Sequence, residues 1–526
     1  MNAFYQKNKL LLWGLVFFLA VFLRTYHIDR QSLILFDEGA QILRAQTFKA
    51  FVFHQTEAVI PYYYVDTKAA WIFLLLLVQI FVGDAVYYAN LLSALFGLLS
   101  ISVTYFLARR LFKSEAVAFL SAGFLAISPL HVYLSRLAIP ETMNMLFSVL
   151  ALYFYLRATE KGQPRVLAAA AGICLSIAFL ANILRVAFVP VFFILIELYM
   201  FTQRKEQYRK DFFRFLLFII SFILAAYAAA EYIYGIYRWQ GLKIIPYLNG
   251  LDIYWKMGAV YLRSNFLSSV IYLLIIGRTE GYLFYALGVS SLFFVRKKPY
   301  ALLLIFAMIA AHILGFSLIP EKGNRLLSTI APLFSVLYAA AVFNFYSLAR
   351  GRIKKALFFI LIALICWSGI KQSWRIAQFQ SDFKAAAEMI GKLDPDSHIL
   401  TTNMADVQVY VPSKKVEHIF GISLGDLRKY YTEGYRYILT DPLRYGVVSI
   451  DRKTINAIEA GCRPLKCFDH FEKDAMLREF YILTSVSDLA SIIDALKREG
   501  RADMSLSLYE VKPCLERIEN RQDRAY

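Results

Sequence analysis

The chain has 526 residues, of which 59% are hydrophobic, 16% aromatic and 18% charged. Soluble globular domains carry about 25% charged residues, so this composition excludes an ordinary water-soluble fold. The net charge of +18 does not indicate nucleic-acid binding, because the basic residues form short clusters between apolar stretches instead of one patch. The composition predicts a polytopic integral membrane protein.

The first apolar stretch, residues 10–26, follows Lys7 and Lys9 and resembles a signal peptide in its position. No small-residue cleavage site follows it, and it runs into polar residues such as Arg24 and Asp29. We therefore predict a retained signal anchor that forms the first span, with the amino terminus in the cytoplasm.

Further apolar stretches, long enough at about 20 residues to cross a bilayer, recur as far as residue 374. Basic clusters occupy every second connecting loop, which the positive-inside rule places in the cytoplasm. This alternation predicts about eleven transmembrane helices, or up to thirteen if residues 69–82 and 266–277 cross instead of lying in the outer interface. The predicted spans lie near residues 10–26, 86–108, 116–134, 138–156, 166–184, 186–203, 212–230, 280–295, 300–319, 326–348 and 356–374.

Two adjacent acids, Asp37 and Glu38, lie in the first outward loop within an otherwise apolar sequence. They are candidates for catalysis, and Arg44 and Tyr62 in the same loop are candidates for substrate binding. The alternative is that both acids only solvate the start of an amphipathic helix, where negative charge suits the helix dipole. The residues alone leave both interpretations open.

A third acid, Glu141, lies at the outer end of the fourth predicted span, five residues after Arg136. A charged side chain costs about 2.5–3.5 kcal/mol at the centre of a membrane helix and less near the interface, so partners are expected. Glu141 is therefore a candidate functional acid. A purely structural pair with Arg136 is the alternative.

Basic residues on the outward side break the positive-inside trend, and Lys322 and Arg325 lie there between two spans. Together with Lys68 and Arg136 they are candidates for holding an anionic lipid headgroup, since arginine suits bidentate phosphate contact. Headgroup anchoring without catalysis is the competing explanation.

After Trp374 the composition changes to a soluble pattern, which predicts a membrane domain over 1–374 and a soluble domain over 375–526. The runs "HILTT", "YRYILTD" and "SLSLYEV" are typical of strands, and "SDLASIIDALKREG" is typical of a helix. Ser381 is a predicted helix cap before "FKAAAEMIGKL". These patterns predict a small α/β domain, which an odd number of spans places outside the cytoplasm.

The cysteines and short motifs add little about cofactors. Cys462 and Cys467 in "CRPLKC" would close a small disulfide loop in an oxidising compartment. No cysteine or histidine cluster has the spacing of a zinc site, and neither a P-loop nor a GxGxxG motif occurs. No metal ligands and no cofactor are predicted, although a divalent cation between carboxylates stays an open alternative.

Three segments carry a family resemblance: the acidic pair Asp37 and Glu38, the stretch that begins "DTKAAWIFLLLLVQIF", and "SRLAIPE" before the fourth span. The segment "EKGNRLLSTIAP" resembles a later outer-loop motif of the same family more loosely. The chain resembles the C-type (GT-C) glycosyltransferases of the protein O-mannosyltransferase and lipid A aminoarabinose transferase kind. It departs from them in reading "TKAAW" where members often have Lys-Pro-Pro.

The resemblance implies an all-α polytopic membrane domain with a small extracytoplasmic α/β domain at the carboxyl end. It also implies a polyprenyl-phosphate-linked sugar donor, a lipid, glycan or protein acceptor, and transfer with inversion on the outer side of a bacterial plasma membrane. Asp37 would be the general base, and Glu38 and Glu141 would position substrates. Lys68, Arg136 and Arg325 would stabilise the departing lipid phosphate.

A transporter or flippase of lipid-linked saccharides is the alternative function, since it would use the same basic groove without turnover. Transporters are expected to carry charged residues deep inside several spans or to show repeated discontinuous helices. This chain concentrates its charge at one surface, which favours the enzyme.

Overall fold

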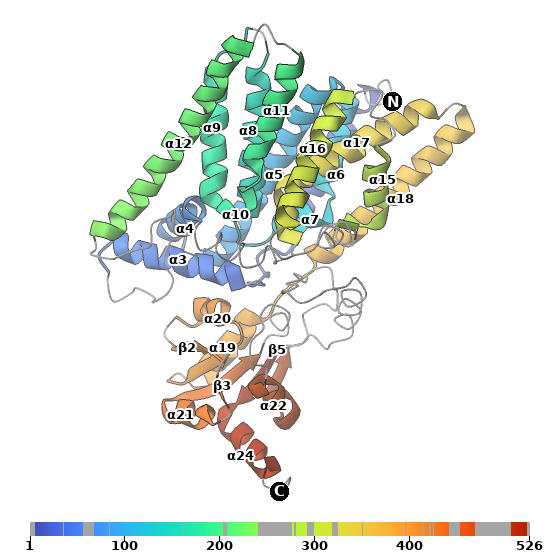
Figure 1. The fold of residues 1–526 in the computed structure, drawn as a ribbon. Helices are drawn as coiled ribbons and strands as arrows, with labels where there is room; N and C mark the ends of the chain where they lie inside the picture. Colours follow the sequence, from blue (N-terminus) through green and yellow to red (C-terminus); the bar gives the residue numbers. More distant parts are fainter. Residues whose placement is uncertain are drawn as a thin grey trace. The chain divides into compact units, whose positions relative to one another are not determined.

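The computed structural model of the chain is mostly helical, and its described residues include a small sheet (Figure 1). Its residues form two compact units, one of Met1–Ile28 with Ala45–Gln378 and one of Asp29–Arg44 with Phe379–Tyr526. The structure describes residues 6–34, 36–55, 68–83, 85–160, 162–203, 208–239, 276–277, 280–291, 299–317, 324–349, 351–394, 396–412, 414–419, 422–423, 425–440, 453–468 and 506–522.

The described part of the first unit consists mainly of helices. They are α2 (Lys9–Thr25), α4 (Ala69–Phe81), α5 (Ala85–Phe112), α6 (Glu115–Ala126), α7 (Pro129–Leu134), α8 (Glu141–Ala158), α9 (Val166–Ala181), α10 (Ile183–Val186), α11 (Val189–Gln203), α12 (Tyr208–Trp239), α15 (Tyr282–Ser290), α16 (Pro299–Ser317), the 3₁₀ helix η4 (Asn324–Ile330), α17 (Ala331–Leu348) and α18 (Arg352–Ala377). A further helix, α3 (Phe36–Val52), spans the division between the units.

Two of these helices, α6 and α7, begin with a serine at the N-cap position. The side chain of Ser114 accepts from the backbone N–H of Val117 at the start of α6, and Ser128 does the same for His131 at the start of α7. A proline follows Ser128 at the first helical position, where its missing N–H is no loss. The two caps lie at the breaks between α5 and α6 and between α6 and α7.

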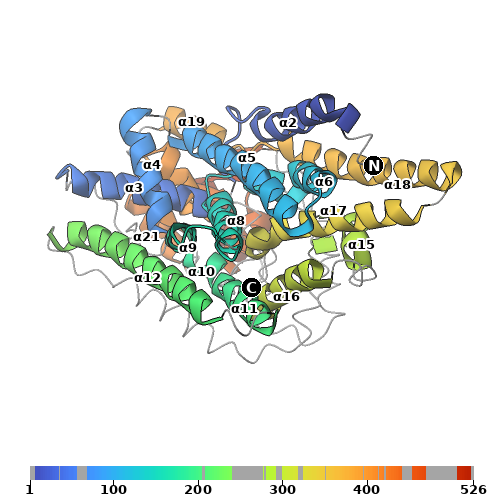
Figure 2. The ribbon, with the colours of Figure 1, turned by 90° about the horizontal axis from the view of Figure 1, so that it is seen from above.

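Helices α5, α8, α9 and α12 follow one another in space, each packed on the next (Figure 2). Small residues permit this close packing, as Gly172 on α9 shows. A Cβ atom there would lie 2.1 Å from Ser221 Oγ and 2.5 Å from the carbonyl oxygen of Phe218, both on α12. Helix pairs in membranes commonly use such small residues to approach each other.

Among the described residues, three helices are long and apolar enough to cross a membrane: Ala85–Phe112, Arg325–Leu348 and Arg352–Ala377. Several shorter apolar helices accompany them. These helices support an integral membrane protein, while the count of eleven to thirteen spans stays a prediction. The apolar stretch predicted at 69–82 forms α4, and most of 266–277 lies outside the described residues.

The second unit contains a mixed five-stranded sheet in the order β2-β1-β3-β5-β4. Strand β1 pairs in parallel with β2 and β3, and β5 pairs antiparallel with β3 and β4. The three predicted strands are found, as β1, β3 and β5. The elements are α19 (Phe383–Leu393), β1 (His398–Thr401), α20 (Met404–Tyr410), β2 (Val416–His418), α21 (Asp426–Thr432), β3 (Tyr435–Thr440), α22 (Lys453–Gly461), β4 (Lys466–Phe468), β5 (Leu506–Glu510) and α24 (Val511–Gln522).

One prediction for this unit is wrong, and another falls on residues that the structure does not describe. Ser381 does not cap α19, because its hydroxyl donates to the carbonyl oxygen of Leu33 and the N-cap position is held by Asp382. The helix predicted from "SDLASIIDALKREG" lies outside the described residues.

The disulfide also differs from the one predicted. Cys462 at the end of α22 pairs with Cys514 in the first turn of α24, with 5.0 Å between their Cα atoms. Cys467 is instead a free, exposed residue on β4. Helices α22 and α24 pack together, and this tertiary contact brings together two cysteines that are 52 residues apart.

Counting thiols tests this pairing. In denatured, non-reduced Cys467→Ser protein, maleimide is expected to label two cysteines, Cys174 and Cys366, because the Cys462–Cys514 bond survives the substitution. A pair between Cys462 and Cys467 would instead be destroyed by the substitution and would leave four labelled cysteines. Mass spectrometry of the labelled chain distinguishes the two results, and reduced protein is the control.

Candidate functional site

The two predicted catalytic acids lie in the first turn of α3, in the second unit. Glu38 is fully buried, and its Oε2 accepts a hydrogen bond of 2.8 Å from the backbone N–H of Ile34. This bond satisfies a backbone donor ahead of the helix and places negative charge at the positive end of its dipole. Asp37 is only partly buried. Glu38 therefore orders the helix start, and Asp37 is the more accessible acid.

Helix α20 of the second unit lies directly against this turn. The backbone N–H of Gly39 donates to Asp406 Oδ1 at 3.0 Å, and the side-chain amide of Asn403 donates to Asp406 Oδ2 at 2.7 Å. A Cβ atom at Gly39 would lie 2.5 Å from Asp406 Oδ1 and 2.6 Å from the carbonyl carbon of Ala405. Glycine is required here because backbone meets backbone.

The residues that precede α3 are fixed by the same unit. The hydroxyl of Tyr410, at the end of α20, accepts hydrogen bonds from Ser32 Oγ at 2.8 Å and from the backbone N–H of Leu33 at 3.0 Å. Burial raises the pKa of Tyr410, so its hydroxyl stays protonated at neutral pH. Carboxyl-terminal residues thus hold Gly39 in the acidic turn and Ser32 and Leu33 just before it.

Gly39→Ala is expected to disturb this contact strongly, because the added methyl meets backbone atoms of α20 that cannot rotate away. We expect a loss of stability of about 1–3 kcal/mol with the side chain of Asp37 chemically intact. Limited proteolysis and thermal unfolding of the purified protein are the measurements. Gly14→Ala is the matched control, since no atom lies within 4 Å of a Cβ there. Equal behaviour of both variants would contradict the contact.

A buried ionic cluster lies in the first unit, at the start of α8. Glu141 Oε1 is 3.4 Å from Arg185 Nε and 3.9 Å from Arg325 Nη1, and all three side chains are at most 5% exposed. Among the described residues, Glu141 Oε2 and Arg185 Nη1 have no hydrogen-bond partner. Two guanidinium groups thus face one carboxylate, and a buried excess charge of this kind is costly unless an anion joins it.

Breaks between helices bring the cluster together. Helix α9 ends at Ala181, and the side-chain amide of Asn144 on α8 donates to the carbonyl oxygens of Ala178 at 2.7 Å and Asn182 at 3.2 Å. The short helix α10 then presents Arg185, whose carbonyl oxygen accepts from Thr329 Oγ1 of η4 at 3.0 Å. These bonds join α8 to the end of α9 and α10 to η4, and so help to bring the three charged residues together.

A second buried ion pair in this unit provides a contrast. Glu197 on α11 pairs with Arg214 on α12 and accepts a hydrogen bond from the hydroxyl of Tyr155 on α8. One carboxylate here faces one guanidinium group, so the charges balance. The Glu141 cluster differs from this pair, because two guanidinium groups lie beside its one carboxylate.

Arg136 does not pair with Glu141 as the structural alternative supposed. Its Nη1 donates to the carbonyl oxygens of Leu23, Arg24 and Tyr26 at the end of α2. Carbonyl groups at a helix carboxyl terminus attract cations, so this arginine stabilises the end of the first helix. The phosphate-binding role of Arg136 stays a prediction.

The remaining predicted substrate-binding residues belong to different elements or lie outside the described residues. Lys68 occupies the N-cap position of α4 in the first unit. Arg44 lies on α3 in the second unit, where its Nη1 donates to Gln41 Oε1 at 3.4 Å. Tyr62 and Lys322 lie outside the described residues.

Arg185 was not among the predicted site residues, although the sequence contains a signal for it. Arg185 stands in the connection between the predicted spans 166–184 and 186–203, which the predicted topology places on the outer side. It breaks the positive-inside trend in the same way as Lys322 and Arg325. In the part of the chain that the structure describes, no group of three or more His, Cys, Asp or Glu side chains is placed to hold a metal ion.

Comparison with known proteins supports the family resemblance. Residues 68–229, which include Lys68, Glu141 and Arg185, match the family model described as dolichyl-phosphate-mannose-protein mannosyltransferase. A search of the curated proteins found no significant match. The predicted resemblance to the GT-C glycosyltransferases is confirmed, and the family match supports a glycosyltransferase.

Solved structures show the same fold at low sequence identity. ArnT from Cupriavidus metallidurans, bound to undecaprenyl phosphate, is 12% identical with a TM-score of 0.60, over 95% of this chain and 98% of that chain. The oligosaccharyltransferase AglB from Archaeoglobus fulgidus, in complex with an inhibitory peptide and a dolichol-phosphate, is 14% identical with a TM-score of 0.52, over 84% and 70%.

Proposed function

We propose that the chain transfers a monosaccharide from a polyprenyl-phosphate carrier to an acceptor hydroxyl or phosphate on the outer side of the membrane, with inversion at the sugar carbon. The observation that carries this proposal is the buried cluster of Glu141, Arg185 and Arg325, whose excess positive charge suits a lipid phosphate. The ArnT and AglB structures, which hold undecaprenyl phosphate and a dolichol-phosphate, add support from the same fold.

In the proposed reaction with a hydroxyl acceptor, Asp37 removes the proton of the attacking oxygen. That oxygen forms a bond to the anomeric carbon while the bond from this carbon to the phosphate oxygen breaks. The electron pair of the broken bond stays on the lipid phosphate, where Arg185 and Arg325 stabilise the charge. The proton stays on the carboxylate of Asp37, and a single displacement needs no nucleophile from the enzyme.

Other residues have supporting roles in this proposal. Glu141 holds the two guanidinium groups in position through its Oε1, and Glu38 keeps the start of α3 in place. Lys68, Arg136 and Lys322 are further cations for the lipid phosphate, and Arg44 and Tyr62 are contacts for substrate. We place the protein in a bacterial plasma membrane. The 1–374 domain carries out the chemistry on the outer side, and the 375–526 domain lies outside the cytoplasm.

A transfer assay separates this function from transport. Purified protein in liposomes receives a polyprenyl-phosphate sugar labelled in the sugar, together with lipid, glycan or peptide acceptors. The enzyme is expected to release unglycosylated polyprenyl phosphate in step with the labelled product. If the intact labelled lipid crosses the bilayer while its sugar bond is never cleaved, the chain is a flippase.

A further inference from the structure

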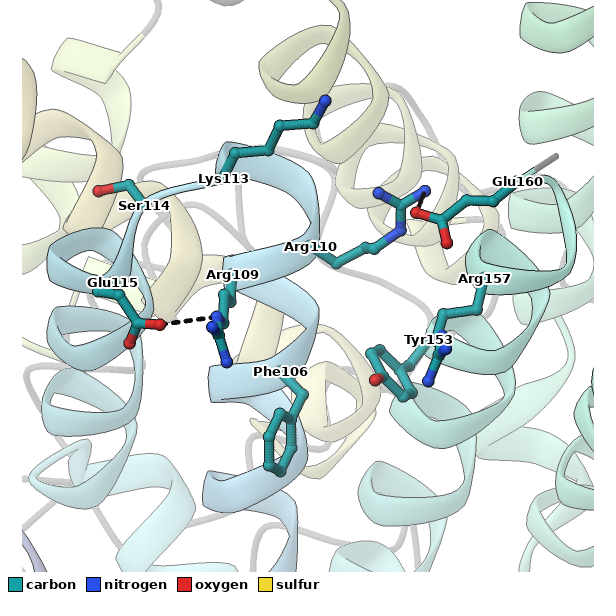
Figure 3. Close-up of a pocket in the computed structure, with 9 residues that line it drawn as sticks. All are labelled: Phe106, Arg109, Arg110, Lys113, Ser114, Glu115, Tyr153, Arg157 and Glu160. Atoms are coloured by element: carbon teal, nitrogen blue, oxygen red, sulfur yellow. Dashed lines mark ion pairs between the residues drawn. The ribbon is translucent and has the colours of Figure 1, made fainter. Parts of the chain in front are cut away.

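A basic cavity of about 520 Å³ lies in the first unit where helices α5, α6 and α8 end or begin (Figure 3). Four cations and two carboxylates contribute to its wall, which leaves a charge of +2. The predicted topology places these helix ends on the cytoplasmic side, opposite the proposed chemistry. The lining residues are Phe106, Arg109, Arg110, Lys113, Ser114, Glu115, Tyr153, Arg157 and Glu160.

Internal pairing satisfies only half of these cations. Arg109 Nε lies 2.8 Å from Glu115 Oε1, and Arg110 forms an ion pair with Glu160. Within the described part of the chain, Arg157 donates to a neutral amide, that of Gln163, at 3.2 Å and forms no ion pair. Among the described residues, Lys113 has no ion pair. The buried Nε of Arg110 has no hydrogen-bond partner there either. The cavity thus offers cationic groups and an unused donor to an anion.

The backbone conformation of Lys113 also favours anion binding by this cavity. This residue follows α5 in the left-handed conformation, with φ of +49°. Helices usually place glycine at such a position, because a side chain is strained there. A lysine in this conformation adds a cation to the rim of the cavity at the cost of that strain.

An apolar stripe leads along α5 to the cavity. Leu95, Leu99 and Phe106 are 50%, 43% and 46% exposed, and their spacing of four and seven residues puts them on one face of the helix. Arg109 continues this face one turn beyond Phe106, into the cavity wall. The ring of Phe106 lies 6.2 Å from that of Tyr153 on α8, so aromatic groups separate the apolar stripe from the cations.

We propose that this cavity binds the phosphate of an anionic phospholipid headgroup, with the acyl chains along the Leu95–Leu99–Phe106 stripe. The order of apolar stripe, aromatic ring and cations matches the order of acyl chain, interface and headgroup in a leaflet. A soluble phosphate would need the cations but would leave the stripe without a role. Anionic lipids concentrate in the cytoplasmic leaflet, which is the predicted side of the cavity.

Lipid retention by the purified full chain tests the proposal. Native mass spectrometry is used to compare phosphatidylglycerol with phosphatidylcholine of the same acyl chains. The wild type is expected to retain phosphatidylglycerol preferentially. In the double variant Lys113→Gln/Arg157→Gln, the affinity for phosphatidylglycerol should fall by roughly 25-fold, at about fivefold for each cation removed. The charge-preserving pair Lys113→Arg/Arg157→Lys should keep at least part of the preference, which separates charge from folding.

The matched control is Arg352→Gln/Lys354→Gln, which removes the same charge from exposed positions on α18 outside the cavity. It should leave the preference within about twofold of the wild type, since neither residue lines the cavity and salt screens exposed charges. Equal retention of the two lipids by the wild type, or equal losses in the cavity and control variants, would overturn the proposal. Displacement of phosphatidylglycerol by inorganic phosphate would assign the cavity to a soluble anion instead.

Discussion

Asp37→Asn is expected to lower the rate of sugar transfer by about 10²–10⁴-fold, because the amide cannot accept the proton of the acceptor hydroxyl. The substitution keeps the size of the side chain, and Asp37 is only partly buried, so folding and donor binding should persist. The measurement is single-turnover release of polyprenyl phosphate, with donor affinity determined separately. A loss confined to the chemical step identifies the base.

The first outward loop offers two matched controls. Asp29 is exposed in the same segment, so Asp29→Asn should leave transfer unchanged. Glu38→Gln should keep the start of α3, since an amide oxygen still accepts the hydrogen bond from the N–H of Ile34. Glu38→Ala should lose that hydrogen bond. If Asp37→Asn transfers sugar at the wild-type rate, another group activates the acceptor, or the acceptor is a phosphate that needs no base.

The sequence predicted local structure well where one interaction dominates. Burial in lipid demands about 20 apolar residues in a row, and α5, α17 and α18 follow from that demand alone. The β-branched and aromatic run of "YRYILTD" forms β3 for a similar reason, because such residues suit a packed sheet.

The sequence did not predict contacts that depend on tertiary structure. Arg185 reaches Glu141 only because α9 ends at Ala181 and α10 turns the chain back. The short spacing of Cys462 and Cys467 favoured a local disulfide, yet packing of α22 on α24 selected Cys514. In the same way, Ser381 bonds to Leu33, a residue 348 positions away, instead of capping its own helix.

Glu141→Gln should reveal the excess charge of the buried cluster. Without the carboxylate, two buried guanidinium groups lose their counter-charge, and breaking such a pair costs about 3–5 kcal/mol. The apparent melting temperature of the purified protein should therefore fall, as measured by tryptophan fluorescence. Added polyprenyl phosphate should raise it again by more than in the wild type, because the phosphate supplies the missing negative charge.

The balanced pair of Glu197 and Arg214 provides the control for this experiment. Glu197→Gln should destabilise the protein to a similar extent, since it also leaves a buried guanidinium group without its carboxylate. Polyprenyl phosphate should give no additional recovery there. Equal recovery in the two variants would mean that the lipid stabilises the protein without contacting the Glu141 cluster.

Arg185→Gln makes the opposite change and completes the test. It leaves one guanidinium group, Arg325, beside the carboxylate of Glu141, so the protein without lipid should lose less stability than Glu141→Gln does. Affinity for polyprenyl phosphate should nevertheless fall by about 10- to 100-fold, the size of a lost hydrogen bond to a charged group. A fall in stability with unchanged lipid affinity would assign Arg185 to folding. Glu141→Gln and Arg185→Gln together thus show whether the second guanidinium group of the cluster serves lipid binding or folding.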